Sequence, residues 1–273
     1  MMKSKELIDS DIIFDKYKDV FQFGTNENLD RVLIDNTLGF SNLKSFNDPF
    51  EMSYSYFHYV KNFEEALAYA SKKYNNPENN LEFKVRKIIN EELESIKVSC
   101  FSESPFEPLM WAHYANKHKG ICYYFDKTKI FPRFGIIKSK KVTYSNSLSE
   151  IRFFEKTTSM DILKPQIESI IYTKSENWAY EKEYRYWKKT NDNSLKFNPE
   201  SLKAIIVGFR NTKKDEIIKS VKEYNIKNGT DVKIIYSRPS PQFYKMIFSY
   251  KHGIKSSSTT ITPYDLDDKP IKL

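Results

Sequence analysis

Glycine is scarce along this chain, with seven glycines among 273 residues. The phosphate-binding loops of the common nucleotide-binding folds need several glycines within one short segment, because the backbone must approach the phosphate closely. Neither of their usual patterns, GxxxxGK and GxGxxG, occurs in the sequence. The chain is therefore not expected to adopt a nucleotide-binding fold of that kind.

The apolar pattern predicts short strands and helices that do not alternate regularly. Apolar runs bounded by turn residues predict strands at 20–23, 37–41, 98–102, 120–125, 134–144, 202–209, 232–236 and 243–250. Helical spacing of apolar residues predicts helices at 27–35, in two parts of 57–97, at 149–171 as one helix or as two separated near Pro165, and at 213–224. This order favours an α+β fold of mixed or antiparallel sheets with flanking helices over a doubly wound parallel sheet.

Domain organisation is expected to be simple, because no internal repeat and no linker interrupts the sequence. We expect one catalytic-type domain at 20–250. Residues 1–19 are polar with a short apolar patch, which indicates an arm or a helix that docks on this domain. Residues 251–273 begin with a Ser/Thr-rich stretch, and a poorly ordered C-terminal tail is expected there.

The charge and the cysteine content limit the possible partners and the cellular location of the protein. The formal net charge of +8 indicates an acidic partner, most commonly nucleic acid, although a lysine-rich surface without that role would give the same balance. Two cysteines, Cys100 and Cys122, are too few for a disulfide framework, and no N-terminal apolar signal region occurs. No apolar run approaches the roughly 20 residues that span a bilayer. The sequence therefore predicts a cytoplasmic protein with reduced thiols and no membrane partner.

The segment 100–126 concentrates rare, chemically versatile side chains. Both cysteines and two of the four histidines lie within it. His113 and His118 are five positions apart, which does not place both rings on one helical face, and no third ligand is evident, so no metal is expected. The side chains of Trp111, His113 and Tyr114 fit a stacking pocket for a base or a nicotinamide ring better, and they fit ordinary core packing equally well.

A second stretch, 172–187, places Glu181, Glu183 and Arg185 at alternate positions. In an extended strand such side chains share one face. A carboxylate kept ionised by Arg185 beside an aromatic cleft could polarise a sugar hydroxyl or stabilise an oxocarbenium-like centre. The alternative is a solvated ladder of ion pairs on a strand surface.

Three ordered blocks resemble a bacterial family of domains of unknown function. They read SFNDPFE at 45–51, CFSE continuing to LMWAHYANKHKGICYYFD at 100–126, and WAYEKEYRYW at 178–187. The resemblance covers about 20–236. The layout is also similar to the ADP-ribosyltransferase fold, as in DNA-thymidine ADP-ribosyltransferase toxins and in transferases of anti-phage defence systems.

That resemblance implies roles for particular residues, with NAD as the substrate. Glu183 would be the catalytic glutamate, paired with Glu181. The residues beside the dinucleotide would be Ser41, Phe46, Asn47, His113 and Tyr114. Gly24 stands where family members often carry a basic residue, so either another residue such as Arg31 would replace it or activity would be reduced. The residues toward the nucleic acid would be Trp111, His118 and Arg185.

The resemblance implies an NAD-dependent mono-ADP-ribosyltransferase that modifies DNA or RNA in a toxin–antitoxin or anti-phage setting, with an antitoxin or defence protein as partner. The alternative is a sensor or adaptor that binds nucleic acid without turnover. A hydrolase using the carboxylates with a divalent metal has weaker support, because the acids lack clustered Asp or His residues.

Overall fold

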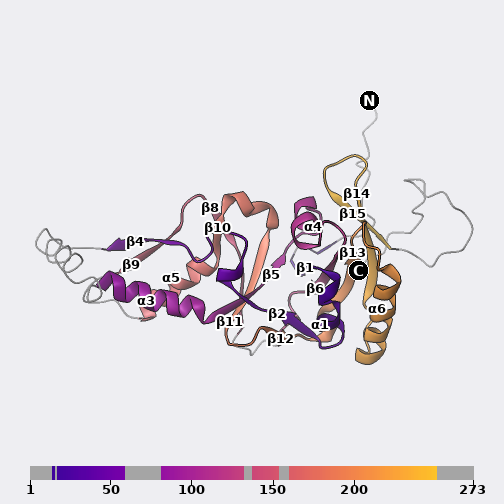
Figure 1. Ribbon diagram of the computed structural model, residues 1–273, viewed down its shortest axis with the longest axis horizontal. Helices are drawn as coiled ribbons and strands as arrows, with labels where there is room; N and C mark the ends of the chain where they lie inside the picture. The colour runs from indigo at the N-terminus through magenta and orange to yellow at the C-terminus, as the bar shows by residue number, and fades with distance from the viewer. Residues whose placement is uncertain (1–13, 16, 59–80, 132–136, 154–159, 251–273) are drawn as a thin grey trace, which may run out of the picture.

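A mixed sheet of nine strands runs through the computed structural model, which describes residues 14–15, 17–58, 81–131, 137–153 and 160–250 (Figure 1). Its strands are β1 (Asp19–Gly24), β3 (Ser41–Asn42), β5 (Ile96–Ser102), β6 (Ile121–Asp126), β7 (Lys138–Lys141), β11 (Glu183–Lys189), β13 (Leu202–Val207), β14 (Lys233–Pro239) and β15 (Met246–Tyr250). They follow the order β15-β14-β13-β6-β1-β5-β11-β7, and β3 pairs with β5 off this path. Neighbouring strands are antiparallel except β13 and β14.

The middle of this sheet is buried on both faces. Every residue of β6, which reads ICYYFD, is buried, and β13 reads LKAIIV with one half-buried lysine. Strands covered on both faces carry continuous apolar runs instead of alternating ones. The predicted strands at 120–125 and 202–209 are therefore confirmed, to within two residues at their ends.

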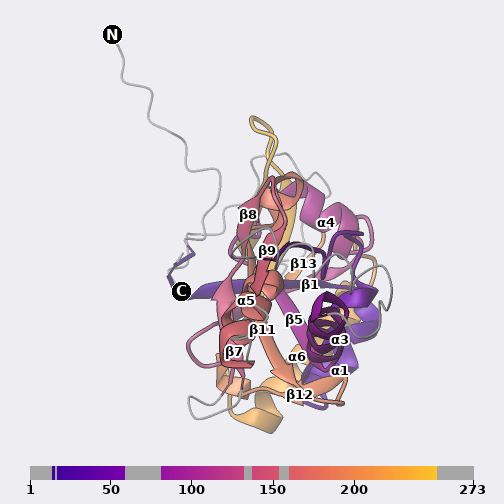
Figure 2. The same cartoon turned by 90° about the vertical axis from the view of Figure 1, so that its left-hand side faces the viewer.

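Two helices cover one face of the β6 and β13 region and a third covers the other. Helices α1 (Leu29–Leu33) and α6 (Lys214–Asn228) lie side by side and share one apolar cluster with β6 and β13 (Figures 1 and 2). Helix α4 (Pro108–Tyr114) contributes Trp111 to the cluster on the opposite face. Helix α6 ends at Gly229, whose φ of 64° is a left-handed cap that glycine adopts without strain.

The β5 and β11 end of the sheet packs against two other helices. Helices α3 (Leu81–Glu94) and α5 (Met160–Ile171) bury their apolar residues against Ile96, Val98 and Trp187. Three two-stranded sheets complete the fold: β2 (Thr37–Gly39) with β12 (Ser194–Lys196), β8 (Thr143–Ser145) with β10 (Thr173–Ser175), and β4 (Tyr54–His58) with β9 (Ser149–Phe153). Among the described residues, no helix has the length and apolar character needed to cross a membrane.

The α+β class is confirmed, and three predicted elements differ from the structure. The strand predicted at 37–41 is divided into β2 and β3, which belong to different sheets, and the one predicted at 134–144 is divided in the same way into β7 and β8. The predicted helix at 149–171 begins as strand β9, in which Ile151 is buried between exposed neighbours, the alternation typical of a strand. Helix α5 follows from Met160 and retains Pro165 inside it. Most of the predicted arm at 1–19 and the whole predicted tail at 251–273 lie outside the described residues. The same is true of residues 59–80, which include most of the first helix predicted within 57–97.

Candidate active site

The sheet opens between β1 and β5. These strands share a single pair of facing residues, Phe21 with Ser102, although β1 pairs with β6 along its whole length and β5 does the same with β11. Strand β3 joins the same edge of β5 only at Val98 and Lys97. Among the described strands, the segment 99–101 of β5 therefore has no partner on this edge. Gln22 partly fills the gap, because its Nε2 donates to Ser99 Oγ at 3.0 Å.

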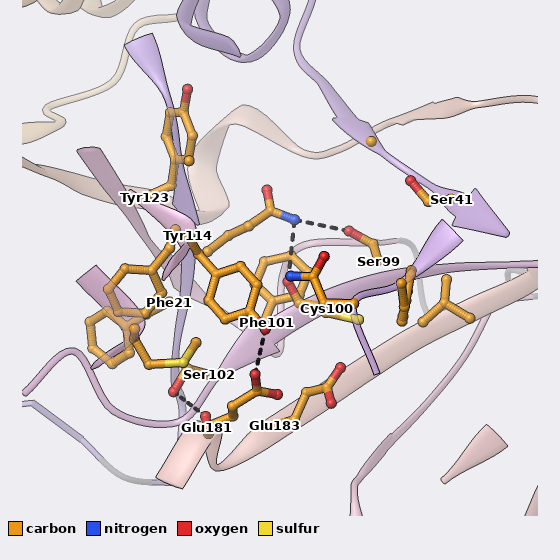
Figure 3. Close-up of a pocket in the computed structure, with 18 of the residues that line it drawn as sticks. Phe21, Ser41, Ser99, Cys100, Phe101, Ser102, Tyr114, Tyr123, Glu181 and Glu183 are labelled. Carbon is orange, nitrogen blue, oxygen red and sulfur yellow. Dashed lines mark hydrogen bonds between the residues drawn. The ribbon is translucent and has the colours of Figure 1, made fainter. Parts of the chain in front are cut away.

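A cavity of about 490 Å³ lies at this opening (Figure 3). Its walls come from β1, α1, β5, α4, the loop after β3 and the segment between β10 and β11. Seven residues singled out in the sequence line it: Arg31, Ser41, Phe46, Asn47, Tyr114, Glu181 and Glu183. Residues from four separate parts of the sequence thus meet around one space.

Four other predicted site residues are not among those that line the cavity. Trp111 is fully buried in the core, where its Nε1 donates to the Pro105 carbonyl oxygen at 2.8 Å. Arg185 is also fully buried. His118 packs on Phe209 with ring centroids 5.1 Å apart, and His113 is exposed on α4. A direct nucleic-acid contact by Trp111 or Arg185 would require these buried side chains to become accessible.

Glu181 and Glu183 reach the cavity from a turn and not from one strand. Glu181 ends the 3-10 helix η4 (Glu176–Glu181), and Glu183 begins β11. Between them Lys182 adopts a left-handed backbone with φ of 46°. The prediction that both glutamates alternate along a strand is therefore wrong for Glu181. Ser102 Oγ donates to the Glu181 carbonyl oxygen at 2.6 Å and fixes this turn against β5.

The glutamates belong to a buried network of five charged side chains. Arg185 donates to Glu183 from Nε at 2.9 Å and from Nη2 at 3.0 Å, and it binds Glu51 in the same two-pronged way. Lys174 Nζ lies 2.5 Å from Glu181 Oε2 and 3.4 Å from Glu183 Oε2. The side chains of all five are at most 6% exposed. A solvated ladder on a strand surface is therefore excluded as the description of these residues.

The network sets the charge of its members. Burial alone would raise the pKa of Glu183, but Arg185 and Lys174 outweigh burial and hold that pKa at about 2. Burial dominates for Glu51 and raises its pKa, although Arg185 opposes the change. For Lys174, burial would lower the pKa, but the three carboxylates raise it. Glu183 is thus an ionised carboxylate at neutral pH inside a largely buried site.

Tyr114 connects the network to the aromatic wall. Its hydroxyl donates to Glu181 Oε1 at 2.6 Å, as the dashed line in Figure 3 shows. Burial and the neighbouring Glu181 raise the pKa of Tyr114 well above its usual value, so the phenol stays protonated. Asn47 has a smaller effect in the opposite direction and lowers the pKa of this hydroxyl. Glu181 is therefore oriented from two sides, by a phenol and by the ammonium group of Lys174.

Sequence reasoning missed three members of the site. Glu51 lies at the end of the SFNDPFE block, and the block itself was the available signal. Lys174 and Gln22 carried no signal, because both depend on contacts with residues distant in the sequence. In the part of the chain that the structure describes, no group of three His, Cys, Asp or Glu residues is arranged to hold a metal ion.

Comparison with known proteins gives one match. Residues 110–186 match the sequence model of a family described as "Protein of unknown function (DUF2971)". The matched segment contains α4 from Met110 onward and both glutamates of the cavity, and it ends within β11. No curated protein and no solved structure matches the chain significantly.

Proposed function

We propose that this protein is an NAD-dependent mono-ADP-ribosyltransferase whose acceptor is a nucleic acid. The observation that carries the proposal is the pair Glu181 and Glu183, which one turn directs into a cavity with aromatic walls. The ordered sequence blocks support it independently, through their resemblance to the ADP-ribosyltransferase layout. A toxin–antitoxin or phage-defence setting, with its partner protein, rests on that resemblance alone.

The chemistry requires a negative charge next to a developing positive one. The bond between ribose C1′ and the nicotinamide nitrogen breaks, its electron pair leaves with nicotinamide, and the ribose becomes oxocarbenium-like. An ionised carboxylate in a dry site stabilises that cation and accepts a hydrogen bond from a ribose hydroxyl. Glu183 meets this requirement, because Arg185 and Lys174 keep it charged and fixed in position.

Transfer then needs an acceptor that loses a proton. The nucleophilic atom of the acceptor forms a bond to ribose C1′, and its proton passes to a base. Glu181 lies on the same turn, and its carboxylate is held by Tyr114 and Lys174. In the proposed scheme Glu181 orients the acceptor and receives this proton.

The cavity contains groups that could bind the leaving group, nicotinamide. Phe46 and Tyr114 line the cavity and provide aromatic surface for a nicotinamide ring. The unpaired edge of β5 at 99–101 supplies backbone donors and acceptors of the kind that a planar carboxamide binds.

A basic turn next to the cavity supports a nucleic-acid acceptor. It consists of Lys117 and Lys119, which follow α4, and of Arg210, whose backbone N–H donates to the His118 carbonyl oxygen at 3.1 Å. Within the described chain none of these three cations makes an ion pair with an acidic side chain. Helix α4 carries Tyr114 into the cavity, and Lys117 follows Tyr114 by three residues, so the proposal places the phosphates of the acceptor at this turn.

The proposal is tested by incubating the protein with adenylate-labelled NAD and single-stranded DNA, duplex DNA, RNA or protein. We expect nicotinamide release and label on one nucleic acid, both lost in Glu183→Gln. The matched control is Glu176→Gln, an exposed position of the same η4 helix, and circular dichroism must show that both variants are folded. Absence of label and of nicotinamide release from folded wild-type protein would overturn the proposal.

A non-catalytic nucleic-acid sensor is the second candidate, and the basic turn favours it equally. Such a module would bind nucleic acid with a strong salt dependence. Its binding would persist in Glu183→Gln, and no nicotinamide would be released. The same two variants therefore separate the two functions.

A further inference from the structure

Two polar groups in the cavity have no hydrogen-bond partner among the described residues. Among the described residues, seven buried side-chain N or O atoms lack a hydrogen bond, and two of them, Arg31 Nε and Tyr123 Oη, belong to residues that line this cavity. Buried polar groups are almost always paired, because an unpaired one loses its bonds to water without replacement. A ligand or a solvent molecule in the cavity would satisfy both groups.

Arg31 is free to bind an anion. Its guanidinium makes no ion pair or hydrogen bond with any described residue, and the neighbouring Asp30 is exposed. The group lies over Gly39, where an added Cβ would approach Nη1 to 2.8 Å, so a larger residue at 39 would make the guanidinium shift. A planar guanidinium presents parallel donors that match the oxygens of a phosphate.

Tyr123 contributes a hydroxyl donor to the same end of the cavity. It comes from β6, directly opposite Gln22 of β1, and it is 1% exposed. Arg31 is close enough to act on the charge of this hydroxyl. Figure 3 shows Tyr123 and the two glutamates at opposite sides of the drawn residues. Tyr123 thus lies away from the end of the cavity where Lys174 pairs with the two glutamates.

We infer that Arg31 and Tyr123 form a phosphate-binding subsite that holds the diphosphate of the ligand whose ribose lies at Glu181 and Glu183. The inference deepens the proposed function, since NAD carries a diphosphate next to the ribose that reacts. Arg31 would then provide the positive charge that related proteins often carry at the position of Gly24. Binding at this subsite requires a phosphorylated ligand and no turnover.

Titration calorimetry with three probes tests the subsite. ADP-ribose carries the diphosphate and cannot release nicotinamide, nicotinamide riboside lacks phosphate, and inorganic pyrophosphate carries only the diphosphate. We expect wild-type protein to bind ADP-ribose at least about tenfold more tightly than nicotinamide riboside, which corresponds to one charged hydrogen bond. Pyrophosphate should compete with ADP-ribose.

Matched variants separate the subsite from general effects on the fold. Arg31→Gln should weaken ADP-ribose binding about tenfold or more, and Gly39→Ala should weaken it by displacing the guanidinium. Tyr123→Phe should weaken it severalfold. The controls are Arg238→Gln and Tyr250→Phe, which remove equally buried and unpartnered atoms that lie outside the cavity. Both should bind ADP-ribose as the wild type does.

The outcomes distinguish this inference from the proposed function. Three results would overturn the subsite. Wild type and Arg31→Gln could bind ADP-ribose equally, the Arg238→Gln control could lose as much affinity as Arg31→Gln, or wild type could fail to bind ADP-ribose. If Arg31→Gln still turns over NAD with an unchanged KM, the subsite is wrong and the transferase stands. If ADP-ribose binding depends on Arg31 but no nicotinamide is ever released, the subsite stands and the transferase is wrong.

Discussion

Arg185 holds the carboxylate of Glu183 through two parallel hydrogen bonds, at 2.9 and 3.0 Å, while the same guanidinium binds Glu51 across 134 residues of sequence. Its Nη1 also donates to the Ile171 carbonyl oxygen at 2.6 Å. One buried cation thus joins the loop after β3, the end of α5 and the start of β11. Arg185 positions the glutamate that we propose as catalytic, and it does so from behind the cavity wall.

Removal of this guanidinium should destabilise the protein strongly. Arg185→Met leaves Glu51 and Glu183 buried near a single cation, and such a change typically costs about 3–5 kcal/mol of unfolding free energy. Arg152→Met is the control, because Arg152 pairs with Glu150 at the surface and exposed pairs contribute about 0–1 kcal/mol. Urea denaturation measures both. A loss below about 1 kcal/mol for Arg185→Met would contradict the structural role given to the network.

Acid should weaken the protein through Glu183. The pKa of Glu183 is about 2 in the folded state, below its ordinary value of 4.5, so its stabilising effect is present above pH 4.5 and is lost as the pH falls toward 2. Glu51 acts in the opposite direction, because its pKa is raised in the folded state. Comparison of wild type with folded Glu183→Gln isolates the effect. The Tm difference between them should be largest near pH 6 and shrink below pH 4; a constant difference would argue against an ionised Glu183.

Strong local patterns explain which elements were predictable. The runs ICYYFD and LKAIIV could be assigned to strands because both faces of their sheet are buried. The segment of β9 was predicted as the start of a helix, because its alternation of buried and exposed residues is short and the helix α5 follows it closely in the sequence. Glu181 was predicted to lie on a strand because the alternation in EKEYR includes it. The left-handed backbone conformation of Lys182 interrupts the strand, and a lysine at that position does not indicate such a conformation.

The long-range partners of the site could not be predicted. Glu51 and Lys174 join the network through contacts that depend on how distant segments fold together. The opening between β1 and β5 is likewise a property of strand register, and residue pattern alone does not reveal it. In contrast, the sequence blocks did bring together Phe46, Asn47, Tyr114 and both glutamates, which now line one cavity.

Two neighbouring residues of α4 should differ sharply in their effects. Tyr114→Phe removes the 2.6 Å hydrogen bond to Glu181, whereas His113→Ala alters an exposed side chain. If the proposed transfer occurs, Tyr114→Phe should lower kcat about 10- to 100-fold, in the range expected when a group that orients a catalytic carboxylate is lost. His113→Ala should leave kcat within about twofold. Equal effects of the two changes, measured by nicotinamide release, would remove Tyr114 from the reaction.

The basic turn should control nucleic-acid binding without affecting the cavity. Replacing Lys117 and Lys119 together with Gln removes two exposed cations that have no acidic partner among the described residues. If each contacts one phosphate of a single strand, the slope of log K against log salt should become shallower by about 1.4, twice the value for one contact. The control pair is Lys219 and Lys222, exposed on α6. Fluorescence anisotropy with a labelled oligonucleotide measures the slopes, and an unchanged slope in the Lys117/Lys119 variant would place the nucleic acid elsewhere.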